Sequence, residues 1–475
     1  MQINETDIKK MVEQVLQQLG QSQPDSSPVS SLPEVSFGNG VFTTVDEAAA
    51  AARLAWEKLR KLPVAVRRQM IENMREVSRK HANELAKLAV EETGLGRVED
   101  KVAKILLATN KTPGLEDLIS TSYSGDDGLT LVEYAPIGVI GSITPSTNPA
   151  ATIINNSISL LAAGNTVVYN PHPSAKLVSI KTMQLLNEAI VAAGGPENTL
   201  TSVAAPNLET SAEVMNHPQV NALVVTGGGP VVKAAMAVGK KVIAAGPGNP
   251  PVVVDETAII SKAAADIVKG ASFDNNVLCT AEKEVFVVEK VANALKSEMV
   301  KNGAIELKGF QFEKLLEKVL VKKGDKFYPN RDFIGKDANV ILQAAGIQAS
   351  PDVRLIIAET NKDHPLVMTE MLMPILPIVR VPDVDKAIEL AVIAEKGNRH
   401  TAIMHSQNIT NLTKMAQEIQ ATIFVKNGPS VSGLGFESEG FTTLTIAGPT
   451  GEGLTSAKTF TRQRRCVLVD GFRII

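Results

Sequence analysis

The sequence predicts an α/β protein with two doubly wound domains. Segments of helix and strand character alternate strictly from residue 147 to residue 245. We expect helices over 147–163, 175–193, 209–216 and 230–239, and strands over 166–170, 200–204, 221–226 and 241–245. Repeated strand–helix units of this kind are typical of a parallel sheet with helices on both faces. The Gly/Pro-rich segment "GPGNPP" marks the crossover to a second block.

The second α/β block covers residues 246–422 and supplies its own strand candidates, "PPVVVD", "EVFVVE", "RLIIAE", "LPIVRV" and "HTAIMH". Upstream of both blocks, Val45 to Ile119 has mainly helical periodicity, and no chemistry is evident there. The segment "LTLVEYAPIGVIGSITPS" follows the turn "GDDG" and predicts a strand, a corner at Pro136 and a second, buried strand. The tail "CVLVDGFRII" alternates as a strand without an obvious domain, so pairing with another subunit is open to it.

The N-terminus predicts a separate amphipathic helix over residues 1–20. Its apolar residues recur at helical spacing on one stripe, namely Ile8, Met11, Val12, Val15, Leu16 and Leu19. Residues 21–40 are rich in Ser, Pro and Gly, a composition typical of a flexible linker. A helix held behind such a linker favours docking in a groove of a partner, and docking onto its own domain is the alternative.

Composition indicates a globular, cytosolic protein with small-molecule ligands. Lys and Arg number 48 against 51 Asp and Glu, so the net charge of -3 gives no reason to expect nucleic acid or an anionic membrane as partner. No stretch approaches the ~18 apolar residues of a membrane span, and no cleavable leader is evident. Two cysteines exclude a disulfide framework, and the six histidines lack metal-ligand spacing, so we expect no metal.

Three predicted strand ends of the first block carry polar residues suited to a cofactor. The segment "ITPSTNPAA" places Thr144, Pro145, Ser146 and Asn148 after a strand. The Asn148 amide could donate to an oxyanion, although a helix cap is the commoner use of such a residue. The other segments are "YNPHPS", with Asn170, His172 and Ser174, and "TGGGPVV", with Thr226, Gly227 and Gly228. The last offers backbone amides to a phosphate, but it lacks the third glycine of G-x-G-x-x-G, and a plain turn is the alternative.

Cys279 is the candidate nucleophile. It lies in "ASFDNNVLCTAEKEVF", where polar residues on both sides suggest a loop or helix end that opens to a cleft. The alternative is a buried cysteine that acts as a small apolar residue. Cys466, in "RQRRCVLVD", is assigned a structural role.

Several motifs together resemble the aldehyde dehydrogenase superfamily, and within it the CoA-acylating enzymes of ethanolamine- and propanediol-degrading bacterial microcompartments. They include "ETGLGRVEDK", "TPSTNPA", "VVTGGGP", "GPGNPPVVVDET", "GASFDNNVLCTAEK", "HPLVMTEMLMPILP" and "PTGEG", in order from about Val41 to the C-terminus. The resemblance implies an aldehyde dehydrogenase-like fold. Its parts would be an NAD-binding domain over 41–245 with 435–460 returning to it, a catalytic domain over 246–434, and oligomerisation strands over 125–136 and 461–475.

The resemblance also implies roles for single residues. Cys279 matches the nucleophile, and Asn148 matches the amide that forms an oxyanion hole with the Cys279 N–H. Thr226 and Gly227 match the loop over the cofactor, and Glu370 matches the glutamate that contacts the nicotinamide ribose. Two departures from hydrolytic members stand out. Asn170 replaces the lysine near the adenosine ribose, and Gly246 to Asn249 stand where the general-base glutamate segment is expected.

These matches imply oxidation of a short-chain aldehyde, such as acetaldehyde or propionaldehyde, with NAD and coenzyme A through a thiohemiacetal and a thioester on Cys279. NAD is expected over NADP, although His172 and Pro173 occupy the region that would meet a 2′-phosphate. The partners implied are a microcompartment shell protein, bound by residues 1–20, and further copies in a homodimer or homotetramer. The alternatives are a non-acylating enzyme that releases the free acid and a silent shell-binding scaffold.

Overall fold

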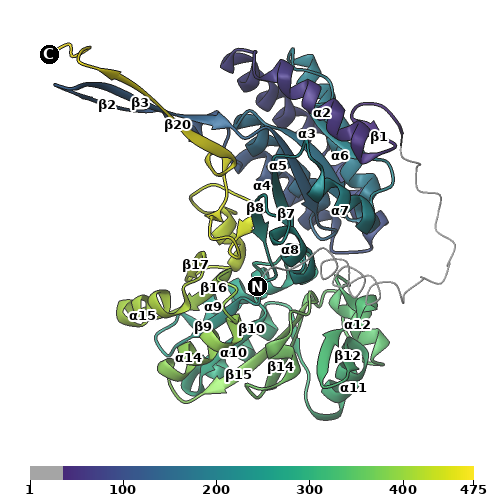
Figure 1. Ribbon diagram of the computed structural model, residues 1–475. Coiled ribbons are helices and arrows are strands. Elements are labelled where there is room, and N and C mark those ends of the chain that lie inside the picture. The colour runs from purple at the N-terminus through teal and green to yellow at the C-terminus, as the bar shows by residue number, and fades with distance from the viewer. Residues whose placement is uncertain (1–35) are drawn as a thin grey trace.

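The computed structural model describes residues 36–475 and consists of two parallel sheets, each covered by helices, with a narrow antiparallel arm projecting from one side (Figure 1). The predicted α/β, doubly wound fold class is confirmed. The N-terminal helix expected over 1–20 and most of the linker expected over 21–40 lie outside the described residues.

The first sheet has six parallel strands in the order β1-β6-β5-β4-β7-β8. Its strands are β1 (Val41–Phe42), β4 (Val139–Thr144), β5 (Thr166–Pro171), β6 (Leu200–Val203), β7 (Ala222–Thr226) and β8 (Lys241–Ala245). Its helices are α2 (Val45–Leu59), α3 (Val64–Thr93), α4 (Val98–Lys111), α5 (Pro149–Ala162), α6 (Lys176–Ala192), α7 (Leu208–Asn216) and α8 (Gly229–Met236). Every element expected between residues 147 and 245 is present with slightly different ends.

The strand order changes direction at β4. Chain connections run from β4 through β5 to β6 on one side, and then return to β7 and β8 on the other side. Ligands of open α/β sheets bind at such a switch point, beyond the carboxyl ends of the strands. The loop that contains Thr144 and Asn148 leaves the sheet at this point.

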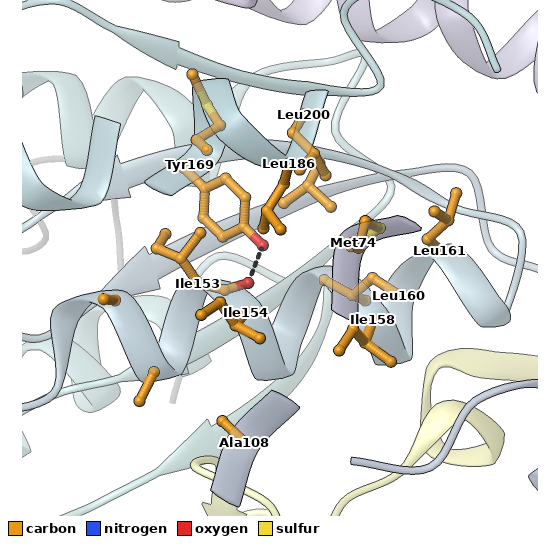
Figure 2. Packing of buried hydrophobic residues seen from close by; sticks show 14 of the residues in the cluster. Met74, Ala108, Ile153, Ile154, Ile158, Leu160, Leu161, Tyr169, Leu186 and Leu200 are labelled. Carbon is orange, nitrogen blue, oxygen red and sulfur yellow. Dashed lines mark hydrogen bonds between the residues drawn. The ribbon is translucent and has the colours of Figure 1, made fainter. Parts of the chain in front are cut away.

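Helix α5 fixes the position of that loop because every one of its residues is buried. Its isoleucines and leucines pack against Met74 of α3, Ala108 of α4 and Leu186 of α6 (Figure 2). The dashed line in Figure 2 joins the Tyr169 hydroxyl to the Ile153 carbonyl at 3.4 Å, and the same hydroxyl lies 2.8 Å from Ser157 Oγ. Close-packed interiors of this kind shift little, so the start of α5 is a rigid support for Asn148.

The second sheet has seven parallel strands in the order β11-β14-β15-β10-β9-β16-β17. Its strands are β9 (Pro251–Val254), β10 (Glu284–Val288), β11 (Ala304–Glu306), β14 (Leu355–Thr360), β15 (Ile375–Val381), β16 (Thr401–His405) and β17 (Ile423–Lys426). The accompanying helices are α9 (Ile260–Ser272), α10 (Glu289–Lys301), α11 (Gly309–Val319), α12 (Ala338–Ala344), α13 (Pro365–Met368), α14 (Val384–Glu395) and α15 (Ile409–Ile419). All five predicted strands are present. The short strands β11 and β17, and a hairpin of β12 (Leu320–Lys323) and β13 (Lys326–Pro329), were not predicted.

After β17 the chain passes back to the first sheet. The Leu444 N–H donates to Asn155 Oδ1 of α5 at 2.9 Å, and Thr445 Oγ1 donates to Asn156 Oδ1 at 3.1 Å. Two short strands follow, β18 (Ile446–Ala447) and β19 (Gly453–Leu454). This returning segment closes one side of the region between the two sheets.

The arm is a three-stranded antiparallel sheet in the order β2-β3-β20, formed by β2 (Thr121–Gly125), β3 (Gly128–Pro136) and β20 (Thr461–Val469). The strand of β3 and the corner at Pro136 were predicted, but β2 was not. The C-terminal strand begins earlier than its motif suggested and pairs with β3 of its own chain, from Thr461 opposite Pro136 to Val469 opposite Gly128. Among the described residues, no strand pairs with the other edge of β20.

Candidate active site

The candidate site lies where the two sheets face each other. In the first sheet, β5, β4 and β7 are neighbours, so the loops after their carboxyl ends meet at one edge. In the second sheet, β15, β10, β9 and β16 are also neighbours. Glu370, Cys279, Gly248 and His400 come shortly before these four strands. Because the strands are parallel, these four residues share the amino-terminal edge of the second sheet.

Lysines 101 and 104 of α4 join the two edges. Lys101 Nζ donates to the Thr147 carbonyl at 3.2 Å and to Asp274 Oδ2 at 3.1 Å. Lys104 Nζ donates to Asn148 Oδ1 and to the same Asp274 oxygen. Thr147 and Asn148 follow β4, whereas Asp274 lies on the segment that leads to Cys279. The expectation of no chemistry between Val45 and Ile119 is therefore wrong.

The segment before Cys279 has an unusual backbone. Asp274, Asn275 and Asn276 have φ values of 47°, 54° and 66°, in the left-handed region where Asn and Asp are tolerated better than most residues. All three are buried. Asn276 Nδ2 donates to the Ala271 carbonyl at 2.8 Å and to the Glu282 carbonyl at 2.9 Å. The polar residues before Cys279 were expected to face a cleft. This expectation is wrong, because their buried side chains stabilise the loop through internal hydrogen bonds.

Lys283 holds the other side of the same loop. Its buried ammonium donates to the Asn276 carbonyl at 2.9 Å, to Asn276 Oδ1 at 2.6 Å and to the Leu278 carbonyl at 3.1 Å. A lysine has three donors and no acceptor, so these bonds use its full capacity. The cation also lies close enough to Cys279 to favour its thiolate.

Cys279 is a half-buried residue. Burial, followed by the nearby Glu370 carboxylate, raises the pKa of the thiol to about 11. Lys283 and Lys104 act in the opposite direction. The unliganded protein therefore holds a protonated thiol at neutral pH, and any change that weakens the influence of Glu370 favours the thiolate.

Glu370→Gln is expected to increase the reactivity of Cys279 in the free enzyme. Removing the negative charge lowers the thiol pKa, and a shift of about one unit raises the thiolate fraction about tenfold while reducing its nucleophilicity, for a net gain of about threefold. The measurement is the rate of iodoacetamide alkylation between pH 7 and pH 9 in a Cys466→Ser background, so that only one thiol reacts. An unchanged or slower rate would contradict this electrostatic account of the site.

Asn148 precedes α5 without capping it, because its side chain makes no capping hydrogen bond. Its amide Nδ2 donates to Thr147 Oγ1 at 3.2 Å, and its oxygen accepts from Lys104. The helix-cap interpretation is therefore not supported. Burial lowers the pKa of Lys104 to about 8, a value that keeps the ammonium mostly protonated at neutral pH.

Gly248 lies between the Cys279 carbonyl and the His400 ring. A Cβ on Gly248 would lie 2.6 Å from the Cys279 carbonyl oxygen and 3.1 Å from His400 Cγ, so only glycine fits. His400 is buried, and burial and Lys283 lower its pKa to about 4, which leaves the ring neutral. Its Nδ1 lies 2.8 Å from Thr401 Oγ1, while its Nε2 is buried without a hydrogen-bond partner. From the sequence, His400 was considered only as a possible metal ligand, and this placement was not predicted.

Glu370 is half-buried at the same edge. Burial raises its pKa, while Lys283 and the Gly248 backbone N–H act in the opposite direction. The segment from Gly246 to Asn249 supplies no ionisable side chain. Asn249 Nδ2 is fully occupied by Glu284 Oε1 and by the Val367 and Ala394 carbonyls, at 3.2, 3.1 and 3.0 Å.

The candidate residues of the first sheet differ in burial and in hydrogen bonding. Thr144 is buried and its Oγ1 has no hydrogen-bond partner, while Pro145 and Ser146 beside it are half-buried. The Asn170 amide is already engaged, since its Oδ1 accepts from Thr210 Oγ1 at 2.7 Å and its Nδ2 donates to the Asn207 carbonyl at 3.3 Å. Asn170 thus supports the start of α7 in this structure.

His172 and the glycine loop leave room for a ligand. His172 has an exposed side chain that accepts hydrogen bonds from Ser174. Partial desolvation by the surrounding protein, followed by Arg331 of the opposite half, lowers its pKa. Thr226 Oγ1 lies 3.1 Å from Thr445 Oγ1 of the returning segment. Around Gly227 and Gly228, an added Cβ would meet nothing nearer than 3.8 Å. Open glycine amides at the start of α8 suit a phosphate group.

Residues 18–307 match the aldehyde dehydrogenase family. The chain belongs to that family. A curated aldehyde dehydrogenase, the acetaldehyde dehydrogenase (acetylating) EutE of Salmonella typhimurium, is 52% identical over 477 residues, which covers 100% of both chains. The predicted resemblance to the CoA-acylating members is confirmed at this level of similarity.

Two solved aldehyde dehydrogenase structures are similar over nearly the whole chain. One is a propionaldehyde dehydrogenase of Rhodopseudomonas palustris with bound CoA and an acylated cysteine, at TM-score 0.89 and 50% identity, covering 91% of this chain and 99% of that one. The other is a propionaldehyde dehydrogenase from the fucose utilisation bacterial microcompartment of Clostridium phytofermentans, at TM-score 0.90 and 49% identity, covering 92% and 100%.

Within residues 36–475, no cluster of His, Cys, Asp and Glu side chains has the arrangement of a metal site. Over the same residues, no helix combines the length and the apolar character needed to cross a membrane.

Proposed function

We propose that this chain oxidises a short-chain aldehyde, such as acetaldehyde or propionaldehyde, with NAD and transfers the acyl group to coenzyme A. The observation that carries this proposal is the composition of the surface around Cys279. The half-buried Cys279 lies within the electrostatic influence of Lys104, which bonds the Asn148 amide, and the nearby Gly246–Asn249 segment has no carboxylate that could activate water. The similarity to acylating relatives supports the same reaction.

In the first half-reaction, the Cys279 thiol releases its proton to solvent, and the resulting thiolate attacks the aldehyde carbon and forms a thiohemiacetal. The carbonyl oxygen gains negative charge, which Asn148 Nδ2 and the Cys279 backbone N–H stabilise. NAD supplies the hydride acceptor when it is bound. Loss of hydride from the thiohemiacetal leaves a thioester on Cys279.

In the second half-reaction, the CoA sulfur attacks this thioester and Cys279 leaves as a thiolate. CoA brings a thiol with a pKa near ~8.5, which is already partly ionised near neutral pH and more nucleophilic than water. We assign the role of proton acceptor to His400, because its neutral ring has a buried Nε2 without a partner and only Gly248 separates the ring from the Cys279 carbonyl. A product that is still a thioester makes the reaction readily reversible.

The residues present fit NAD at the switch point of the first sheet. Thr226, Gly227 and Gly228 would meet the pyrophosphate at the start of α8, and Thr144 to Ser146 line the path toward Cys279. Glu370 would contact the nicotinamide ribose from the opposite edge. His172 would lie near the adenosine ribose, whereas Asn170 acts through the loop that it supports.

The decisive experiment is NADH production from propionaldehyde and NAD with and without CoA, with the product identified by mass. We expect strict dependence on CoA and propionyl-CoA as the product. Turnover to free propionate without CoA would mean that an unidentified base activates water, as in the non-acylating alternative. A protein without any turnover and without a reactive Cys279 would be the silent scaffold.

The arm and the N-terminal segment suggest how the enzyme is assembled. Val467, Leu468 and Val469 of β20 are exposed by 56, 47 and 65%, and the free edge of β20 offers unpaired backbone groups. We assign this edge to contact with a second copy in a homodimer or homotetramer. Residues 1–20 are assigned to a shell protein of a bacterial microcompartment, inside which the enzyme would act.

Deleting residues 1–20 tests the second assignment. The truncated enzyme is expected to keep its activity, because the residues assigned to catalysis and cofactor binding lie between Thr144 and His400, and to lose recruitment to a shell. Co-purification with shells and assay of the free enzyme give both readouts. A large loss of activity in the free truncated enzyme would instead favour a helix docked on its own domain.

A further inference from the structure

We propose that Lys104 is a positioning residue that orients and polarises the Asn148 amide for the oxyanion, with Asp274 holding Lys104 in place. This inference rests on the proposed function of Asn148 and deepens it. It brings into the active site a helix, α4, for which no chemistry was expected from the sequence.

The contacts fix the direction of the amide. The Lys104 ammonium can only donate, so the atom of Asn148 that it meets must be the oxygen. The NH₂ group must then point the other way. One of its hydrogens is used by Thr147 Oγ1 at 3.2 Å, and the other remains available. Without Lys104, the Asn148 amide could rotate by about 180°, which exchanges the positions of its oxygen and its NH₂ group. In the rotated state the amide presents an oxygen to the developing oxyanion.

The same contact strengthens the donor. A cation bonded to the carbonyl oxygen of an amide draws electron density away from the nitrogen, so the remaining N–H becomes more positive. Charge-assisted hydrogen bonds are stronger than neutral ones, and this one lies in a buried site where lysine is only 4% exposed. Lys104 thus carries positive charge to the oxyanion hole without contacting the substrate.

The Asp274 carboxylate compensates the charge of the buried Lys104 ammonium and connects Lys104 to the loop that carries Cys279. Its Oδ2 accepts from both Lys101 and Lys104, and its Oδ1 accepts from the Arg97 N–H at 2.7 Å. Gly96 leaves the space for this carboxylate, because a Cβ there would lie 2.0 Å from Oδ1. One continuous chain of bonds therefore runs from the Cys279 loop through Lys104 to Asn148.

The pair of lysines offers a matched control. Lys101 shares Asp274 with Lys104 and is equally buried, but it donates to the Thr147 carbonyl and not to Asn148. Removing Lys104 still leaves Asp274 paired with Lys101, so a single substitution does not strand a buried charge. A general electrostatic role would affect both lysines alike, whereas the positioning role belongs to Lys104 alone.

The test is a double-mutant cycle on the single-turnover rate of NADH formation at saturating propionaldehyde and NAD. Removing an oxyanion donor costs about 10²–10³-fold, so we expect that loss for Asn148→Ala and a loss of about 10–100-fold for Lys104→Met. Lys101→Met is expected to lose less than Lys104→Met, because it leaves the contact between Lys104 and Asn148 intact. The double variant Lys104→Met/Asn148→Ala is expected to match Asn148→Ala within about threefold, because Lys104 acts through the amide.

Three results would overturn the proposal. The first is an additive loss in the double variant, and the second is an equal loss in Lys101→Met. The third is a fall in the iodoacetamide alkylation rate of Cys279 that equals the fall in NADH formation, which would make Lys104 a stabiliser of the thiolate. Thermal unfolding and NAD titration show that each variant is folded. If Lys104→Met unfolds, Lys104→Gln replaces it, since its amide still donates to Asn148 without a charge and is expected to restore part of the rate.

Failure of this proposal is distinguishable from failure of the proposed function. The double-mutant cycle measures the half-reaction that transfers hydride to NAD, whereas the dependence on CoA measures acyl transfer. An enzyme that released free propionate could still show the coupling between Lys104 and Asn148. A strictly CoA-dependent enzyme could equally lack it.

Discussion

Replacement of Cys279 by alanine is expected to lower NADH formation from propionaldehyde by more than about 10⁴-fold, because removal of a covalent nucleophile leaves only binding and electrostatic effects. NAD binding should change by less than about threefold. The proposed cofactor contacts at Thr226 to Gly228 and at Glu370 do not depend on the sulfur. Stopped-flow absorbance for the chemistry and fluorescence titration for NAD provide the two measurements.

Cys466→Ala is the matched control for this experiment. The second cysteine is exposed on β20 of the arm, far in the fold from the two facing edges, and its loss is expected to leave turnover unchanged. Substantial activity in Cys279→Ala, or strong inactivation in Cys466→Ala, would rule out a thioester on Cys279. Detection of a propionyl adduct on the Cys279 peptide by mass, in the absence of CoA, would support it directly.

Much of the fold could be predicted from the sequence because the spacing of apolar residues indicates which side of a helix or strand is buried. The alternation between residues 147 and 245 predicted the order of all its helices and strands, since the strands are largely buried on both faces and most of the helices have one apolar side. Short strands could not be recognised in this way. β11 has three residues, Ala304–Glu306, and no alternation can be detected over that length.

The chemistry of α4 was missed for a different reason. Lys101, Lys104, Ile105 and Ala108 lie at i, i+3, i+4 and i+7, so both lysines fall on the buried stripe of the helix. Lysines on such a stripe require a buried partner, and this was a signal that the sequence contained. The partner itself, Asp274, could not be found from the sequence, because it is separated from Lys104 by 170 positions.

The interpretation of the polar residues before Cys279 was wrong because solvent access and an unusual buried backbone both favour Asp and Asn. Polar residues beside a nucleophile can indicate solvent access, but Asp274, Asn275 and Asn276 are there for left-handed backbone angles and internal hydrogen bonds. A run of Asp and Asn is tolerated in both settings. The motif located the candidate nucleophile, although the physical account attached to it was wrong.

His400→Gln is expected to slow acyl transfer to CoA without slowing formation of the thioester. Glutamine retains a polar side chain but cannot take a proton from the CoA thiol, and a general base contributes about 10²–10⁴-fold, so steady-state turnover should fall about 10³-fold. Formation of the thioester does not require this group. The variant should therefore release about one equivalent of NADH per active site in a rapid burst, followed by slow turnover at saturating CoA.

His405→Gln is the matched control, because β16 begins at Thr401, directly after His400, and ends at His405. Both histidines are buried, and both have an Nε2 without a hydrogen-bond partner. Only His400 lies at the edge beside Cys279, so His405→Gln is expected to affect stability but not the ratio of burst to steady-state rate. A loss of the burst in His400→Gln would place the residue in the first half-reaction. Unchanged turnover would mean that CoA reacts as a thiolate formed in solution, and the free Nε2 would then have no role in proton transfer.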